Sequence, residues 1–116
     1  MVDAVNRGDA DGASACFTRD GCLITPDATA VHERDRIRPV LSQLISRRAE
    51  IEVDLSSVLR AGSVALAYER WQVRSPGLDG SGVEQTLNPT LVLHRLDDDW
   101  KLALAALWEG MRRPAW

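Results

Sequence analysis

Three side chains in the second half of the chain could carry acid–base chemistry: Glu69, His94 and Glu109. Glu69 and Glu109 each stand in a largely apolar segment. A carboxylate held among apolar neighbours has a raised pKa and can exchange protons near neutral pH. His94 could act as a base, because imidazole titrates close to neutrality. These residues are the candidate catalytic groups.

Each of the three also has an ordinary structural interpretation. Glu69 could pair with Arg70 or Arg95, and Glu109 could lie in solvent beside Arg112. A lone histidine in a strand is more often a hydrogen-bonded structural residue than a catalytic base. The sequence leaves both interpretations open.

Several other kinds of site are not indicated by the sequence. We find no Cys/His cluster with metal-ligand spacing, no Ser/His/Asp triad order and no glycine-rich phosphate loop after a strand. We therefore expect neither a metal nor another cofactor. The net charge of −3 and the pI near 5.3 argue against nucleic-acid binding, which requires a basic surface.

The length of 116 residues predicts one domain, spanning 1–116 with a tail at 111–116. Cys16 and Cys22 lack CxxC spacing and are predicted to be small, buried side chains in a reducing compartment. No apolar run is long enough for a signal sequence or a membrane span. We therefore expect a cytoplasmic protein that does not bind membranes.

The elements that would position these groups are two or three helices followed by a four-strand meander. The clearest helix shows apolar residues at helical spacing, namely Ile37, Val40, Leu41, Leu44 and Ile45. A short strand at 22–24 precedes it. From Ile51 onward the apolar period changes to two, which predicts strands beginning at 51, 64, 86 and 100. This order of elements is typical of an α+β fold.

The second and fourth strands of the meander, 64–68 and 102–108, are apolar on both faces. A sheet with helices on one side only should have a polar outer face, so these strands indicate that both faces are covered. A homodimer is the simplest cover. The alternative is that the small alanines need no burial.

The order and spacing of several short motifs resemble the nuclear transport factor 2-like superfamily, and are most similar to its SnoaL-like and ketosteroid-isomerase-like members. These motifs are Gly8-Asp9, Phe17-Thr18-Arg19-Asp20-Gly21, Pro26, His32-Glu33-Arg34, Ala67 with Trp71, and Asp99-Trp100-Lys101. The resemblance covers about Val5 to Gly110. It implies a cone-shaped roll, in which a curved antiparallel sheet packs on the helices around an apolar pocket. It also implies a homodimer through the outer sheet face.

The residues that perform steroid isomerisation are missing at the matching positions. The general base of that family falls at Thr25, its protonated aspartate near Val92 and its tyrosine at about Met1. Threonine cannot accept a proton near neutral pH, and valine has no donor for an oxyanion. We therefore expect that the chain is not a ketosteroid isomerase.

The resemblance directs Trp71 toward the pocket, and strand alternation then brings Ala67 and Glu69 to the same face. In the last strand the matching residues are Ala105 and Glu109, whereas a slip of one residue would present Trp108 instead. The strand between them is expected to complete the lining with one shared face, namely Asn88, Thr90, Val92 and His94.

These expectations combine into two hypotheses about function. The first is a protein that binds a small apolar metabolite between sheet and helices, with or without acid–base catalysis of an isomerase, cyclase or hydrolase type. The alternative is a non-catalytic, dimeric binding or interaction module. Fold resemblance cannot choose between them, because this superfamily includes both enzymes and non-enzymes.

Overall fold

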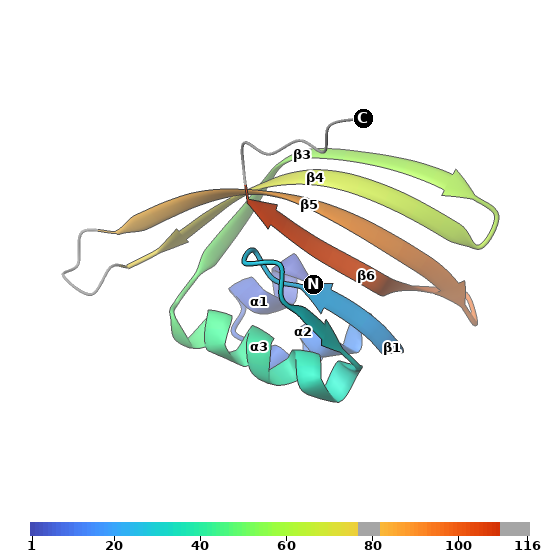
Figure 1. Cartoon of the computed structure of the whole chain (residues 1–116), viewed down its shortest axis with the longest axis horizontal. Helices are drawn as coiled ribbons and strands as arrows, with labels where there is room; N and C mark the ends of the chain where they lie inside the picture. The colour runs from blue at the N-terminus through green and yellow to red at the C-terminus, as the bar shows by residue number, and fades with distance from the viewer. Residues whose placement is uncertain (77–81, 110–116) are drawn as a thin grey trace.

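The structure is a computed structural model that describes residues 1–76 and 82–109. Three helices pack against one face of a curved, six-stranded sheet (Figure 1). The helices are α1 (Val2–Asn6), α2 (Ala10–Ala15) and α3 (Arg34–Ser46). The strands are β1 (Phe17–Ile24), β2 (Ala30–His32), β3 (Glu50–Ala61), β4 (Val64–Ser75), β5 (Val83–Leu96) and β6 (Asp99–Glu109). The predicted α+β class is confirmed.

The strand order is β2-β1-β6-β5-β4-β3, and β3 to β6 form the predicted antiparallel meander. One ladder differs from the expected antiparallel pattern, because β1 pairs with β6 in parallel. The chain leaves β1, forms the short β2 and α3, and returns through the whole meander before β6 reaches β1. The sheet is therefore mixed.

The main helix has the apolar stripe that its spacing predicts. Ile37 and Leu41 are buried, and Val40, Leu44 and Ile45 are half-buried against the core. The helix begins at Arg34, and Asp35 lies in its first turn. A carboxylate in the first turn still interacts favourably with the helix dipole.

The concave face of the sheet, which faces the helices, carries the core. Ladder partners lie on the same face, so Trp71 shares the concave face with Leu87, and Ala67 shares it with Leu91. The register between β5 and β6 shifts after Val92. This bulge brings both Leu102 and Ala105 into the core, although they are an odd number of residues apart.

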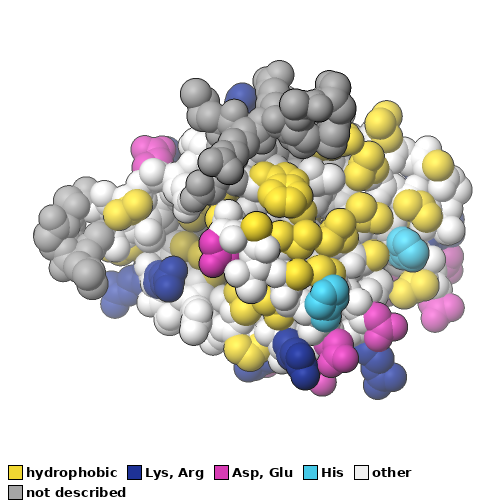
Figure 2. All heavy atoms as spheres, viewed as in Figure 1, with side chains coloured by type: hydrophobic (Ala, Val, Ile, Leu, Met, Phe, Trp, Pro, Cys, Tyr) yellow, Lys and Arg dark blue, Asp and Glu magenta, His cyan; other side chains and the backbone are white. Residues whose placement is uncertain are grey.

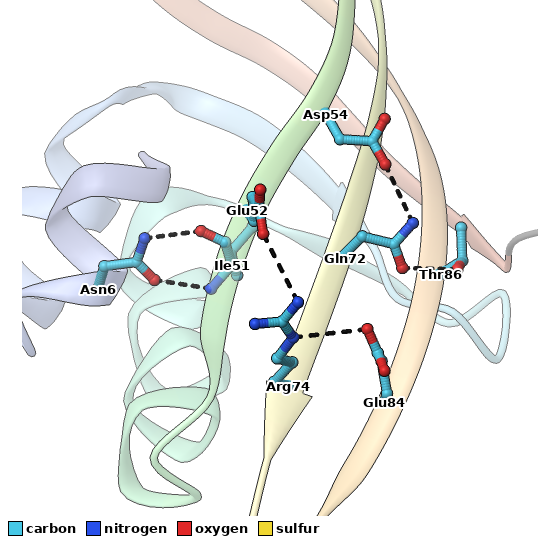
Figure 3. A network of polar contacts seen from close by, with 8 residues as sticks. All are labelled: Asn6, Ile51, Glu52, Asp54, Gln72, Arg74, Glu84 and Thr86. Carbon is cyan, nitrogen blue, oxygen red and sulfur yellow. Dashed lines mark hydrogen bonds and ion pairs between the residues drawn. The ribbon is translucent and has the colours of Figure 1, made fainter.

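One side chain of helix α1, Asn6, forms two hydrogen bonds with the backbone of the edge strand β3 (Figure 3). The Asn6 amide donates to the Ile51 carbonyl oxygen, and its oxygen accepts from the Ile51 amide, both at 2.8 Å. The side chain thus satisfies the backbone of an edge residue as a neighbouring strand would. Polar side chains also link β3, β4 and β5. Arg74 forms ion pairs with Glu52 and Glu84, and Gln72 forms hydrogen bonds with Asp54 and Thr86.

We predict that Asn6→Ala lowers the free energy of unfolding by about 1–3 kcal/mol, because both Ile51 backbone groups lose their partners. Chemical denaturation monitored by tryptophan fluorescence measures this loss. Asn6→Asp is a second test variant. It retains the side-chain acceptor but loses the donor, so its free energy of unfolding should fall as well. An unchanged midpoint for both variants would contradict the role given to Asn6.

Candidate functional site

The described residues line a hollow on each side of Trp71, which is 1% exposed, on the concave face of the sheet. The first, here named the α3 cleft, has a volume of about 460 Å³ and lies between α3, the end of β1 and the sheet. Most of its lining is apolar, from residues that include Leu23, Val40, Leu44, Val73, Leu87 and Leu107. The cleft can therefore surround a hydrocarbon skeleton.

The α3 cleft also contains polar side chains, namely Thr25, Asp27, Gln43, Arg47 and Gln85. The Asp27 carboxylate accepts hydrogen bonds from the Thr25 hydroxyl and from the Thr29 amide. These bonds lower the pKa of Asp27, that from Thr25 most of all. Asp27 is therefore an ionised acceptor at neutral pH and a weak base.

The second hollow, here named the α1 hollow, has a volume of about 380 Å³ and lies between α1 and the strands on the other side of Trp71. It contains Glu69. The Glu69 carboxylate accepts a hydrogen bond from the Trp71 indole at 2.7 Å and one from the Ser56 hydroxyl at 3.4 Å. The strongest candidate acid or base is thus separated by Trp71 from the more voluminous α3 cleft.

The predicted parity of β4 agrees with the structure, since Ala67, Glu69 and Trp71 all lie on the concave side. In β6 Ala105 and Leu107 lie on the concave face, which is the face expected for this strand. Trp108, from the alternative register, lies on the convex face.

The residues that we expected from β5 do not reach the concave side. Thr90 pairs with Tyr68, Val92 with Leu66, and Asn88 with Trp108, whereas the concave residues of β5 include Leu87 and Leu91. Asn88, Thr90, Val92, His94 and Trp108 therefore lie on the convex face, and the expectation that they line the pocket is wrong. The available signal was the apolar alternation of Leu87, Leu91 and Leu93, which marks the covered face of this strand.

Two further expectations concern Ala67, Ala105 and Glu109. Ala67 and Ala105 are 3% and 0% exposed in the packed core and line neither the α3 cleft nor the α1 hollow. The backbone of Glu109 pairs with Leu87 at the end of β6, but its side chain lies outside the described residues. A meeting of Glu69 and Glu109 in one cavity therefore stays a prediction.

Two features of residues 1–76 and 82–109 bear on the type of site. Within these ranges, no three His, Cys, Asp or Glu side chains are grouped so that they could hold a metal ion. No helix there has the length and the apolar composition needed to cross a membrane.

The comparisons with known proteins identify the family. The model of the SnoaL-like domain matches residues 1–112. The chain belongs to the SnoaL-like domain family. No curated protein matches it in sequence.

Solved structures share the fold of this SnoaL-like chain at low sequence identity. A candidate dehydratase of the NTF2-like family from Streptomyces avermitilis is 18% identical, with a TM-score of 0.84 over 96% of this chain and 89% of its own. A candidate aromatic ring hydroxylase from Novosphingobium aromaticivorans is 18% identical, with a TM-score of 0.82 over 96% and 82%. An NTF2-like superfamily protein from Salmonella enterica is 11% identical, with a TM-score of 0.81 over 97% and 85%. Such similarity shows the cone-shaped fold alone.

We predict that Ala67→Leu destabilises the protein by about 1–3 kcal/mol, because the added atoms enter a packed core and not a cavity. Thermal melting compares it with Ala61→Leu, which makes the same change at an exposed position at the end of β3. If Ala67→Leu melts no lower than Ala61→Leu, Ala67 faces free space and the original expectation of a pocket there is restored.

Proposed function

We propose that this SnoaL-like chain binds a small, largely apolar molecule in the α3 cleft. The observation that carries the proposal is the make-up of the cleft, where apolar side chains from α3, β1 and the four strands β3 to β6 surround about 460 Å³. Small-molecule pockets typically measure about 300–1,000 Å³ and combine apolar walls with a few polar groups. Here Thr25, Gln43 and Gln85 would orient the polar end of the ligand.

The same make-up favours binding over acid–base catalysis in this cleft. Among its described lining residues Asp27 is the one carboxylate, and its lowered pKa makes it a poor proton acceptor. Glu69 faces the other hollow, and His94 is on the convex face. Structural neighbours described as a candidate dehydratase and a candidate hydroxylase support small-molecule chemistry on this fold without specifying a reaction here.

We also propose that two copies pair through the convex face of the sheet, as the apolar strands predict. Leu59 and Tyr68 are 64% and 38% exposed there, beside half-buried Leu66, Val92 and Leu104. Figure 2 shows hydrophobic side chains gathered over the strands on the right of the view, with charged side chains mainly around them. A second copy would remove this apolar surface from water.

The proposed location is the cytoplasm. Cys16 and Cys22 are both free thiols, which supports a reducing compartment, although both are half-buried and not fully buried as predicted.

We predict that Leu44→Trp weakens binding of the apolar probe 8-anilinonaphthalene-1-sulfonate about tenfold or more, because the larger ring occupies the α3 cleft. Fluorescence titration measures the dissociation constant. Leu96→Trp, the same change at an exposed position, should leave it unaltered. Equal affinity of the two variants would remove the α3 cleft as the binding site.

We predict that the wild-type chain sediments as a dimer at tens of micromolar, burying at least about 1,000 Å² in total. Val92→Glu should produce a monomer, because it places an unpaired charge in the convex interface. The control is Val58→Glu, since Val58 is exposed on the concave side opposite Ala67. A monomeric wild type, or a dimer that survives Val92→Glu, would refute the pairing.

A further inference from the structure

The α1 hollow differs from the α3 cleft in its charges. Its described lining contains two carboxylic acids, Asp3 and Glu69, and no Lys, Arg or His side chain, while Met1 of the lining bears the amino group at the start of the given sequence. The rest of the lining is mainly apolar and includes the indole rings of Trp71 and Trp100. We propose that the α1 hollow binds a small organic ammonium cation, in addition to the ligand of the α3 cleft.

Glu69 is held in place to meet such a cation. The Trp71 indole donates to one of its oxygens at 2.7 Å, and Trp71 itself is buried and cannot move freely. The Ser56 hydroxyl lies 3.4 Å from the other oxygen. Two carboxylate oxygens can accept about four hydrogen bonds, so Glu69 retains acceptors for an ammonium group. A positioned carboxylate in a partly buried hollow attracts a cation more strongly than one in bulk water.

Trp100 provides the second feature, a ring that already attracts a positive charge. The Arg60 guanidinium lies 5.2 Å from the centre of the Trp100 ring. This is within the range of a cation–π interaction, in which the electron-rich face of an indole attracts a cation. Arg60 itself is exposed beside the hollow. A bound ammonium would therefore interact with the carboxylate and the indole while experiencing some repulsion from Arg60.

The wall between these polar features selects a ligand with a hydrocarbon part. Leu91, Leu93 and Leu102 project into the hollow from β5 and β6. The volume of about 380 Å³ accommodates an alkyl or aromatic group as well as the ammonium. The two hollows share Trp71 alone among their described lining residues, so occupation of one does not require the other.

The test uses three probes of nearly equal shape: 3-phenylpropylammonium, 3-phenylpropan-1-ol and 3-phenylpropionate. Each is titrated into the full chain while the indole N–H signals of Trp71 and Trp100 are followed by NMR. We expect the ammonium to shift both signals and to bind about tenfold more tightly than the alcohol or the anion. Equal binding of the anion, or no shift at about 5 mM ammonium, would overturn the proposal.

Three variants test two points: whether Glu69 binds the cation or has a structural role alone, and whether the α1 hollow binds independently of the α3 cleft. Glu69→Gln still accepts the Trp71 hydrogen bond but lacks the charge, so ammonium affinity should fall about tenfold. Arg60→Gln removes the neighbouring cation and should increase the affinity about two- to threefold. Leu44→Trp should leave ammonium affinity unchanged even where it abolishes binding in the α3 cleft. Unchanged affinity of a folded Glu69→Gln protein would overturn the proposal, whatever happens in the α3 cleft.

Discussion

The burial of one indole ring organises the concave side of this protein. Trp71 lies on the concave face of β4, is 1% exposed, and has an N–H group that would be costly to bury without an acceptor. Glu69, two residues earlier on the same face, supplies that acceptor. The ring thus divides the space under the helices into an apolar cleft beside α3 and an acidic hollow beside α1. The position of Glu69 follows from this arrangement, because its carboxylate accepts the Trp71 hydrogen bond whether or not it also contacts a ligand.

The long strands β3 to β6 determine what the helices can cover. The helices pack on the concave face only, while the convex face keeps apolar residues such as Leu59 and Tyr68 accessible. Side chains that face the concave side and side chains that face the convex side alternate along the same strands. The residues that line the cleft and those of the proposed dimer interface are therefore neighbours in sequence. A substitution in these strands therefore affects one surface or the other according to its parity.

Membership of the SnoaL-like family establishes the fold and leaves the chemistry to the side chains. In this chain, hydrogen bonds lower the pKa of Asp27, and Glu69 lies on the other side of Trp71 from the α3 cleft. The described lining of the cleft therefore contains no group suited to proton transfer near neutral pH. Its apolar walls suit a hydrocarbon skeleton, whereas the carboxylates and indoles of the α1 hollow suit a cation. The two hollows therefore differ in chemical character although one tryptophan borders both.

The amino-acid sequence by itself determined the α+β class, the apolar stripe of α3 through Ile37 and Leu41, the meander, and the shared face of Ala67, Glu69 and Trp71. These features depend on local periodicity, which neighbouring residues set. The tertiary structure decided the parallel pairing of β1 with β6 and the convex position of Asn88, Thr90 and Val92. Alternation tells which residues of a strand share a face. In β5 the leucines favour one face as the covered one, and packing against the helices decides it. The bulge in the β5–β6 ladder changes the parity of β6, and it depends on the pairing of two strands, which the alternation within one strand does not reveal.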